Sequence, residues 1–406
     1  MRPSTALICL LIPVCGMAGG VETEYGGHTK LRLVGQAYPA DSVYRALAGS
    51  TSVDASAALR LKFAASADRW SFDSAYQLLG IRADTLALTP LPSDERRLFG
   101  LTDVISRSDD GALVQRLDRI WVGYASEKAV VRFGRQALSW GNGLAYAPMD
   151  LVNPFDPASV DTEYKAGDDM LYFQYLQDNG NDIQGAWVLR RNPDSGNVDS
   201  EESTAAAKYH GFAGTTEFDL LVAQSYGDTV LGTGISRDVG GAVWSADLVL
   251  TRTERDSYLQ VVSNLLYSWV WAGRNMSGGI EYYFNGFGQG HGRYDPASLA
   301  ANPDLTRRLL RRELFGLGRH YVAGNVLIEI NPLWTLTPSL LVNIEDPSAL
   351  LQLITSYSLG DNLSFLASLD LPVGPGGSEF GGIETGPDGL YLSRDAGVFV
   401  QLAWYF

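Results

Sequence analysis

The chain has 406 residues, a formal net charge of −15, 20 tyrosines and two cysteines. This length suits one large barrel or two to three ordinary domains. The acidic balance excludes nucleic acid as a partner, because phosphates are bound by clustered Lys and Arg side chains. Outside the N-terminus no apolar run approaches the ~20 residues of a spanning helix. Membrane-spanning helices are therefore excluded, whereas spanning strands are not.

Residues 1–18 read as an export signal that is cleaved near Ala18. Arg2 supplies the positive charge, "ALICLLIPVCGMA" the apolar core and "GMAGG" the small-residue cleavage region. We expect a short periplasmic segment over 19–28. Cys9 and Cys15 both belong to the signal, so the mature chain is expected to contain no thiol and no disulfide. The bulky Val14 argues against lipidation of Cys15.

Almost every stretch after residue 28 has one apolar face with a period of two residues. In "SYLQVVSNLLYSWVW", Leu259, Val261 and Leu265 alternate with Gln260 and Asn264. Segments of ~10 residues with this period are the signature of an outer-membrane barrel. The pattern predicts about 18 strands, with 16 as the alternative. The predicted strands are 29–38, 53–67, 70–80, 117–125, 129–136, 169–178, 182–191, 204–213, 216–226, 229–237, 240–252, 257–271, 276–286, 319–331, 334–345, 349–359, 362–372 and 396–406.

The links between these strands are sorted by length. Every link after an even-numbered strand is tight, as in "DRW", "SEK" and "AGT". The long links all follow odd-numbered strands and are 39–52, 81–116, 137–168, 192–203, 287–318 and 373–395. Outer-membrane barrels have short periplasmic turns and long external loops. The predicted fold is therefore all-β, a single transmembrane antiparallel β-barrel over 29–406. It is an up-and-down meander with an even strand number and both termini in the periplasm.

The chain ends on the strand "VFVQLAWYF". One face of this strand is wholly apolar, and a closed barrel would turn that face toward lipid. The face consists of Val398, Val400, Leu402, Trp404 and Phe406. The tail resembles the C-terminal signature of Gram-negative outer-membrane proteins, a final Phe preceded by apolar residues at alternating positions. The resemblance implies that Trp404 and Phe406 are part of an assembly signal read by the barrel-assembly machinery.

The third long link opens with "VVRFGRQALSWGNGLAYAPMDLVNPFDP", residues 130 to 157. Residues 140–143 form a glycine-rich turn, and Pro148, Pro154 and Pro157 stiffen the chain beyond it. The "RFGRQ…WG.G…NPFDP" pattern resembles a segment of several porin-like families and, more distantly, of alginate-export-type channels. In general porins the loop in this position narrows the pore. The resemblance implies an in-folding loop 137–168, although a cap over the barrel mouth stays an alternative. The candidate constriction residues are Trp140, Asp150, Asp156, Asp161, Glu163, Asp168 and Asp169.

Charges on the polar strand faces are segregated along the chain. The early strands present a basic arc of Lys30, Arg32, Arg60, Lys62, Arg119, Arg132, Arg190 and Lys208. The later strands present an acidic arc of Glu217, Asp219, Asp247, Glu281, Glu329, Glu345 and Asp370. Facing arcs would set a transverse field across a water-filled lumen. We expect Arg119 and Arg132 to lie near the constriction. The loop acids, together with Glu329 and Glu345 of the acidic arc, are expected to face them. The alternative is that these charges pair locally and fill the interior.

The link 287–318 contains a predicted helix within "ANPDLTRRLLRRELFGLGRH". Asn302 or Asp304 caps it, and its arginines are expected to pair with the acidic third loop or to bind anionic lipopolysaccharide or an acidic substrate. Enzyme motifs are sparse, since neither GxSxG nor HExxH occurs. The four histidines lack metal-ligand spacing. We therefore expect no enzyme activity, no metal and no cofactor.

The sequence predicts a porin-like channel in the outer membrane of a Gram-negative bacterium. Small polar or charged solutes would diffuse through it, with a mild preference for cations because acids outnumber bases. Expected partners are outer-membrane lipid, lipopolysaccharide and the assembly machinery, and a homo-oligomer is possible. Two rivals stay open. One is a non-conducting surface barrel that binds polysaccharide, as capsule-attachment lectins do, and the other is an accessory barrel threaded by a partner protein.

Overall fold

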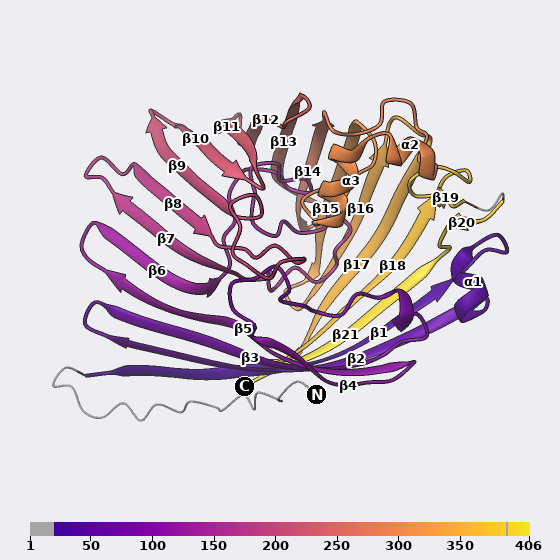
Figure 1. Cartoon of the computed structure of the whole chain (residues 1–406), viewed down its shortest axis with the longest axis horizontal. Coiled ribbons are helices and arrows are strands. Elements are labelled where there is room, and N and C mark those ends of the chain that lie inside the picture. Colours follow the sequence, from indigo (N-terminus) through magenta and orange to yellow (C-terminus); the bar gives the residue numbers. More distant parts are fainter. Residues whose placement is uncertain (1–19, 387–388) are drawn as a thin grey trace.

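The computed structural model describes residues 20–386 and 389–406, which form one antiparallel β-barrel (Figure 1). The predicted signal peptide, residues 1–18, lies outside this range. Eighteen strands form a ring in chain order, and the last strand pairs with the first from His28–Tyr405 to Gln36–Gly397. No helix in the described part of the chain is long and apolar enough to cross a membrane.

The strands of the ring follow the predicted order, and all 18 predicted strands are confirmed. Their bounds are β1 (Glu22–Ala37), β2 (Thr51–Ala67), β3 (Trp70–Arg82), β5 (Gly111–Ala125), β6 (Ala129–Gln136), β7 (Asp168–Leu176), β8 (Asp182–Val188), β9 (Thr204–Ala213), β10 (Thr216–Ser225), β11 (Asp228–Val239), β12 (Ala242–Arg252), β13 (Ser257–Trp271), β14 (Arg274–Asn285), β15 (His320–Asn331), β16 (Trp334–Asn343), β17 (Ser348–Gly360), β18 (Leu363–Val373) and β21 (Gly397–Tyr405).

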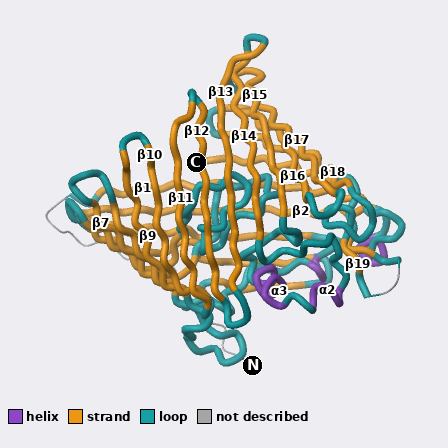
Figure 2. The backbone as a smooth tube through the Cα atoms, turned by 90° about the horizontal axis from the view of Figure 1, so that it is seen from above, coloured by secondary structure: helices purple, strands orange, loops and turns teal. Residues whose placement is uncertain are grey.

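The long links carry the remaining elements. These are α1 (Val43–Ala48), the 3-10 turn Leu86–Leu88, β4 (Thr102–Arg107), α2 (Pro296–Ala300), α3 (Pro303–Leu310) and the small β19–β20 pair (Ile383–Glu384 and Tyr391–Leu392). Figure 2 shows α2 and α3 gathered at one end of the strands. We call this the loop end and the opposite end, which carries the tight turns, the turn end.

Most strand boundaries differ from prediction by three residues or fewer, and two regions differ by more. β1 begins at Glu22, so most of the expected N-terminal segment 19–28 is strand. Glu22 pairs with Ser66 near the end of the long strand β2, and Gly27 pairs with Leu61. The predicted loop 81–116 contains β4, which pairs with the first residues of β5. The sequence "SDDG" forms the turn of this hairpin, where Ser108 N donates to Gly111 O at 2.8 Å. An Asp-Gly pair at a turn is a hairpin signal that the strand pattern overlooked.

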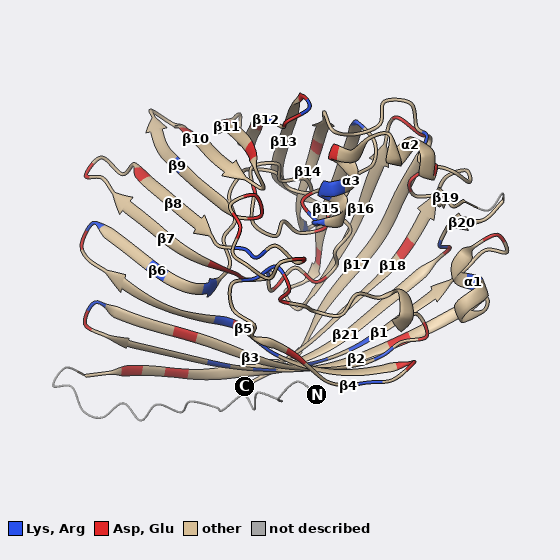
Figure 3. Ribbon diagram, in the orientation of Figure 1, with Lys and Arg blue, Asp and Glu red and all other residues tan. Residues whose placement is uncertain are grey.

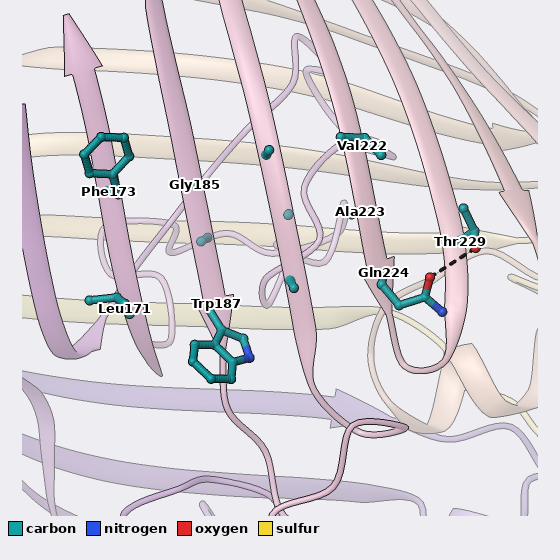
Figure 4. Close-up of a pocket in the computed structure, with 12 residues that line it drawn as sticks. Leu171, Phe173, Gly185, Trp187, Val222, Ala223, Gln224 and Thr229 are labelled. Atoms are coloured by element: carbon teal, nitrogen blue, oxygen red, sulfur yellow. Dashed lines mark hydrogen bonds between the residues drawn. The ribbon is translucent and has the colours of Figure 1, made fainter.

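The outer face of the barrel is apolar and exposed, as expected for a wall that faces lipid. Ile280 is 58% exposed, Leu220 52% and Trp404 52%. The apolar face predicted for the last strand is therefore on the outside. A shallow groove of about 560 Å³ lies on this surface. Figure 4 shows its lining residues, with Gly185 between the larger Phe173 and Trp187. The inward faces carry the polar residues of the same strands.

Candidate functional site

Residues 137–167, which join β6 to β7, turn into the barrel and lie in its central space (Figures 1 and 2). We call them the cross-lumen segment. Their contacts reach inward side chains on β12–β14 and, on the opposite side of the ring, on β1 and β2. This position is the one expected of an in-folding loop. The segment ends one residue earlier than predicted, because Asp168 begins β7.

Two wall carboxylates hold the first arm of the segment. Asp247 on β12 accepts hydrogen bonds from the backbone N–H and the side-chain amide of Asn142, both at 2.7 Å. Glu281 on β14 accepts from three successive backbone amides, including those of Ala145 at 3.1 Å and Tyr146 at 2.8 Å. Both carboxylates are only 1% exposed. These members of the predicted acidic arc therefore bind the segment and do not line open water.

Basic side chains of the opposite wall hold the second arm. Lys30 Nζ lies 2.7 Å from Asp161 Oδ2 and 2.7 Å from Glu163 Oε2, and Arg32 also pairs with Asp161. Tyr405 on the last strand donates to Glu163 at 2.8 Å. The segment thus carries acids to the basic wall and amides to the acidic wall. This charge match orients it across the lumen, and Figure 3 shows the charged stretches of wall and segment together.

An aromatic ring completes the contact with the basic wall. Tyr164 lies among three cations, with the Arg60 guanidinium 4.3 Å and Lys62 Nζ 4.7 Å from the ring centroid. Its hydroxyl also accepts from Lys62. His28 stacks on the same ring with centroids 5.1 Å apart. Cation–π contacts of this kind add to the ion pairs beside them. Strand alternation predicted these bases in the lumen, but no sequence pattern pointed to Tyr164.

Apolar packing fixes the middle of the segment. Trp140 and Met149 join a buried cluster with wall residues of β8, β10, β11 and β12, and the indole N–H of Trp140 donates to Gln184 at 2.7 Å. Tyr146 stacks on Tyr283 with ring centroids 4.6 Å apart. Trp140 is therefore an anchor packed on the wall and not a free constriction residue. Burial of these large side chains favours one fixed position of the segment.

The acids of the segment differ in their surroundings. Burial raises the pKa of Asp150 to about 6, against the opposing charge of Lys165. Burial also acts to raise the pKa of Asp161, but the hydrogen bond and charge of Lys30 outweigh it and hold the pKa below its usual value. Asp156 accepts from the backbone N–H of Ala158 at 2.9 Å and forms no salt bridge with any described residue. Asp156 is thus the segment acid whose charge is least compensated.

Asp168 and Asp169 lie in the wall and not in the segment. Asp169 is fully buried and pairs with Arg135, whose Nε lies 2.8 Å away, while Asp168 pairs with Arg190 at 2.9 Å. Arg190 itself lies just beyond the end of β8. Because both acids are paired and removed from water, they do not line an open passage.

Arg135 is the residue that the alternation pattern missed. Phe133 faces outward, so a regular strand would turn Arg135 outward as well. Gly134 has φ +128°, which breaks the alternation, and Arg135 lies inside with 1% exposure. It bonds Asp169, Asp94 and the carbonyl oxygen of Phe99. The glycine within "RFGRQ" was the available signal, since a Cβ there would lie 2.2 Å from Ile120 O.

The remaining members of the two arcs are not brought together as predicted. Arg119 donates to the carbonyl oxygen of Lys165, but Arg132 lies nearer the turn end, over the rings of Trp121 and Tyr172. Glu329 bonds Asn275 near the turn end, whereas Glu345 follows β16 at the loop end beside His320. The expectation that both glutamates face the two arginines is wrong, because β15 and β16 carry them to opposite ends.

Elsewhere the two arcs meet directly. Lys208 on β9 lies 3.1 Å from Asp219 on the adjacent β10, which is the local pairing given as the alternative. Glu217 is on β10 and forms no ion pair within the described chain, and Asp370 on β18 accepts from Gln352 at 3.2 Å. Gln352 also donates to Ala158 of the segment at 3.0 Å.

The predicted helix in the 287–318 link is confirmed as α3, with Asn302 as its N-cap. Its arginines do not pair with the third loop. Arg308 bonds Asp228 at the β10–β11 turn, and Arg311 lies 3.9 Å from Glu202. Asp228 begins β11 and Glu202 lies in the link between β8 and β9, so these acids, and not those of the third loop, are the partners of the two arginines.

No protein-family model matches the chain, and no curated protein is similar to it in sequence. Solved outer-membrane structures are similar in fold. OccAB4 of Acinetobacter baumannii has a TM-score of 0.55 at 8% identity, covering 95% of this chain and 98% of its own. A BenF-like porin from Pseudomonas fluorescens Pf-5 has 0.53 at 9% identity, and the outer membrane protein opdK from Pseudomonas aeruginosa 0.52 at 9%, with the same coverage. At these identities the likeness shows the fold, an 18-stranded barrel of the porin type.

Proposed function

We propose that this protein is a porin-like channel of a Gram-negative outer membrane, through which small polar or charged solutes diffuse. The cross-lumen segment is the constriction of the channel, and the barrel performs no catalysis. The observation that carries the proposal is the anchoring of this segment on two opposite inner walls. A segment held in this way narrows a lumen without filling its whole length.

The side chains in the turn-end half of the lumen support the proposal that water can pass through the barrel. Inward side chains there are polar and exposed, among them Asn325 on β15 and Ser356 and Ser358 on β17. Next to the segment, inward side chains such as Tyr321 are fully buried. This contrast supports a lumen that is wide at the turn end and narrow at the level of the cross-lumen segment. Selectivity in such channels depends on the charges and hydrogen-bonding groups at the narrow level.

Single-channel recording in a planar bilayer tests this proposal. The full-length mature protein should conduct steadily, and removal of residues 142–165 should raise the conductance while heat-modifiable migration on a gel stays normal. A protein that folds but carries no current would overturn the channel and favour the non-conducting polysaccharide-binding barrel. A conductance unchanged by the deletion would place the constriction elsewhere.

The outer wall of the barrel offers surfaces for the expected partners, which are lipid, lipopolysaccharide, the assembly machinery and a second copy of the chain. The apolar outer wall matches outer-membrane lipid and the acyl chains of lipopolysaccharide. The last strand, with Trp404 and Phe406 on its outer face, is proposed as the signal that the assembly machinery reads. The shallow groove of Figure 4 lies on the same outer wall, where a homo-oligomer would form its contacts.

A further inference from the structure

The glycine-rich turn of the cross-lumen segment has a backbone that other residues cannot adopt. Gly141 has φ +95°, in the left-handed region that favours glycine. A Cβ on Gly143 would lie 1.8 Å from the carbonyl oxygen of Tyr146, so a side chain cannot be placed there without moving the turn. The two glycines of "WGNGLAY" are therefore required by the backbone conformation of this turn.

This backbone turns four main-chain amides toward the wall. The N–H of Asn142 points to Asp247, and those of Leu144, Ala145 and Tyr146 point to Glu281. Successive amides that converge on one carboxylate form an anion-binding nest. Here the anion belongs to the same chain, since Glu281 stands on β14, more than a hundred residues later. Asn264 on β13 supports the arrangement by donating to Asn142 O at 2.8 Å.

The two carboxylates have little other support. Among the residues that the structure describes, neither Asp247 nor Glu281 takes part in a salt bridge. A buried carboxylate is stabilised only when its oxygens accept hydrogen bonds or meet a cation. The amides of the turn supply most of those bonds. Wall and segment therefore depend on each other at this anchor, and the contact excludes water.

The opposite anchor has a different character. Its ion pairs join Lys30, Arg32, Asp161 and Glu163. Lys30 and Asp161 are 3% and 12% exposed, whereas Arg32 is 35% and Glu163 34% exposed. Salt screens the pairs of the partly exposed Arg32 and Glu163, and it screens the buried Lys30–Asp161 pair less. The anchor at β12–β14 contains no ion pair among the described residues, so it is the anchor that is less sensitive to ionic strength.

We infer that Asp247 and Glu281 are positioning residues for the constriction: they bind the backbone of the glycine-rich turn and so set the width and steadiness of the passage. This inference rests on the proposed channel function and names the groups on which its constriction depends. The residues that line the passage act on the solute, whereas these two act through the segment.

Thiol labelling tests the anchor without relying on current. Met149 is fully buried, so Met149→Cys places a reporter that reacts only when the segment leaves the wall. Cys9 and Cys15, the only cysteines of the sequence, belong to the part expected to be cleaved. In this background Glu281→Gln and Asp247→Asn should each label at least about tenfold faster, because bonds to a charged acceptor are lost. Glu217→Gln, which removes the same charge from β10 away from the segment, should label at the background rate.

A variant on the segment side provides an independent arm. Gly143→Ala leaves both carboxylates in place but displaces the turn, and it should label as fast as Glu281→Gln. In bilayers the same three variants should show higher conductance or switching between levels, and Glu217→Gln should be steady. If the parent protein carries no current, the channel function fails while the labelling still decides the anchor. If all three variants fold and label at the rate of Glu217→Gln, the inference is overturned.

Discussion

Lys165 Nζ lies 2.6 Å from Asp150 Oδ1, and both side chains are more than nine-tenths buried inside the barrel. The same ammonium donates to the carbonyl oxygen of Leu138 and, at 2.9 Å, to the hydroxyl of Ser139. One lysine therefore ties both ends of the cross-lumen segment to its middle. The sequence placed Asp150 among the candidate constriction acids, but in the structure it forms an ion pair with Lys165 inside the segment, which we call the clasp.

Breaking this clasp from one side should loosen the segment. Removing one partner of a buried ion pair costs about 3–5 kcal/mol because the other charge stays unpaired. Asp150→Leu or Lys165→Met alone should therefore speed amide hydrogen exchange over 138–165 by a hundredfold or more, while the double variant should largely restore protection. Lys128→Met is the matched control, since its pair with Asp178 is exposed. Equal exchange in the single and double variants would show that the pair does not hold the segment.

The sequence was sufficient to predict the strands of the barrel, but it was not sufficient to predict the contacts inside it. Alternating faces and the sorting of links depend on neighbouring residues, and they predicted every strand of the ring. The contacts of the segment join residues far apart in the chain, such as Glu281 with Tyr146 and Lys30 with Asp161. Composition showed that opposite charges were available. It did not show that the two arcs hold the cross-lumen segment between them, so that this segment lies where open water was expected.

The closing strand predicts an effect on assembly. Phe406 N donates to Gly27 O at 3.1 Å and Phe406 O accepts from Gly27 N at 2.8 Å, while the rings of Trp404 and Phe406 lie 5.2 Å apart on the outer face. Replacing both aromatic residues with Ser removes apolar surface where the ring closes. The amount of heat-modifiable, folded protein in outer membranes should fall. Val398→Ser, at the other end of the same strand, should have a smaller effect. Normal levels of the doubly substituted protein would count against a closing signal.

A buried carboxyl at the loop end predicts a pH-dependent contact. Glu379 accepts hydrogen bonds from Tyr321 at 2.7 Å, Asn343 at 2.6 Å and Leu317 N at 3.1 Å, and so holds the link after β18 on the barrel. Burial raises the pKa of this carboxyl to about 7, against those hydrogen bonds, from an ordinary value of 4.5. The backbone N–H of Glu379 also bonds Asp346, which places a second carboxylate nearby.

The raised pKa sets the direction of the pH dependence. When the link is released, Glu379 has its ordinary pKa, so the released form loses its proton first as the pH rises. The contact is fully present below about pH 4.5 and weakens up to about pH 7, by about 3 kcal/mol at 1.36 kcal/mol for each pKa unit. The hydrogen-exchange protection factors of residues 374–386, which correct for the intrinsic pH dependence of exchange, should be lower at pH 8 than at pH 5. Glu379→Gln should remove the difference, and Glu384→Gln should retain it. Equal protection of the parent protein at both pH values would contradict this assignment.

The acids of the segment should differ in their effect on ion selectivity, because only a charge that is not compensated by a neighbour acts on a passing ion. Asp150 is paired with Lys165, whereas the Asp156 carboxylate accepts from one backbone amide, that of Ala158, and forms no salt bridge with a described residue. Charges act over about 8 Å at physiological ionic strength. Asp156→Asn should therefore lower the cation-to-anion permeability ratio more than Asp150→Asn does, most clearly in dilute salt. Arg132→Gln, on the inner wall toward the turn end, should raise the ratio. The reversal potential across a salt gradient measures each change, with Asp178→Asn as the exposed control. Equal shifts for Asp156→Asn and Asp150→Asn, or shifts of the same sign for Asp156→Asn and Arg132→Gln, would show that these charges do not act on ions in the passage.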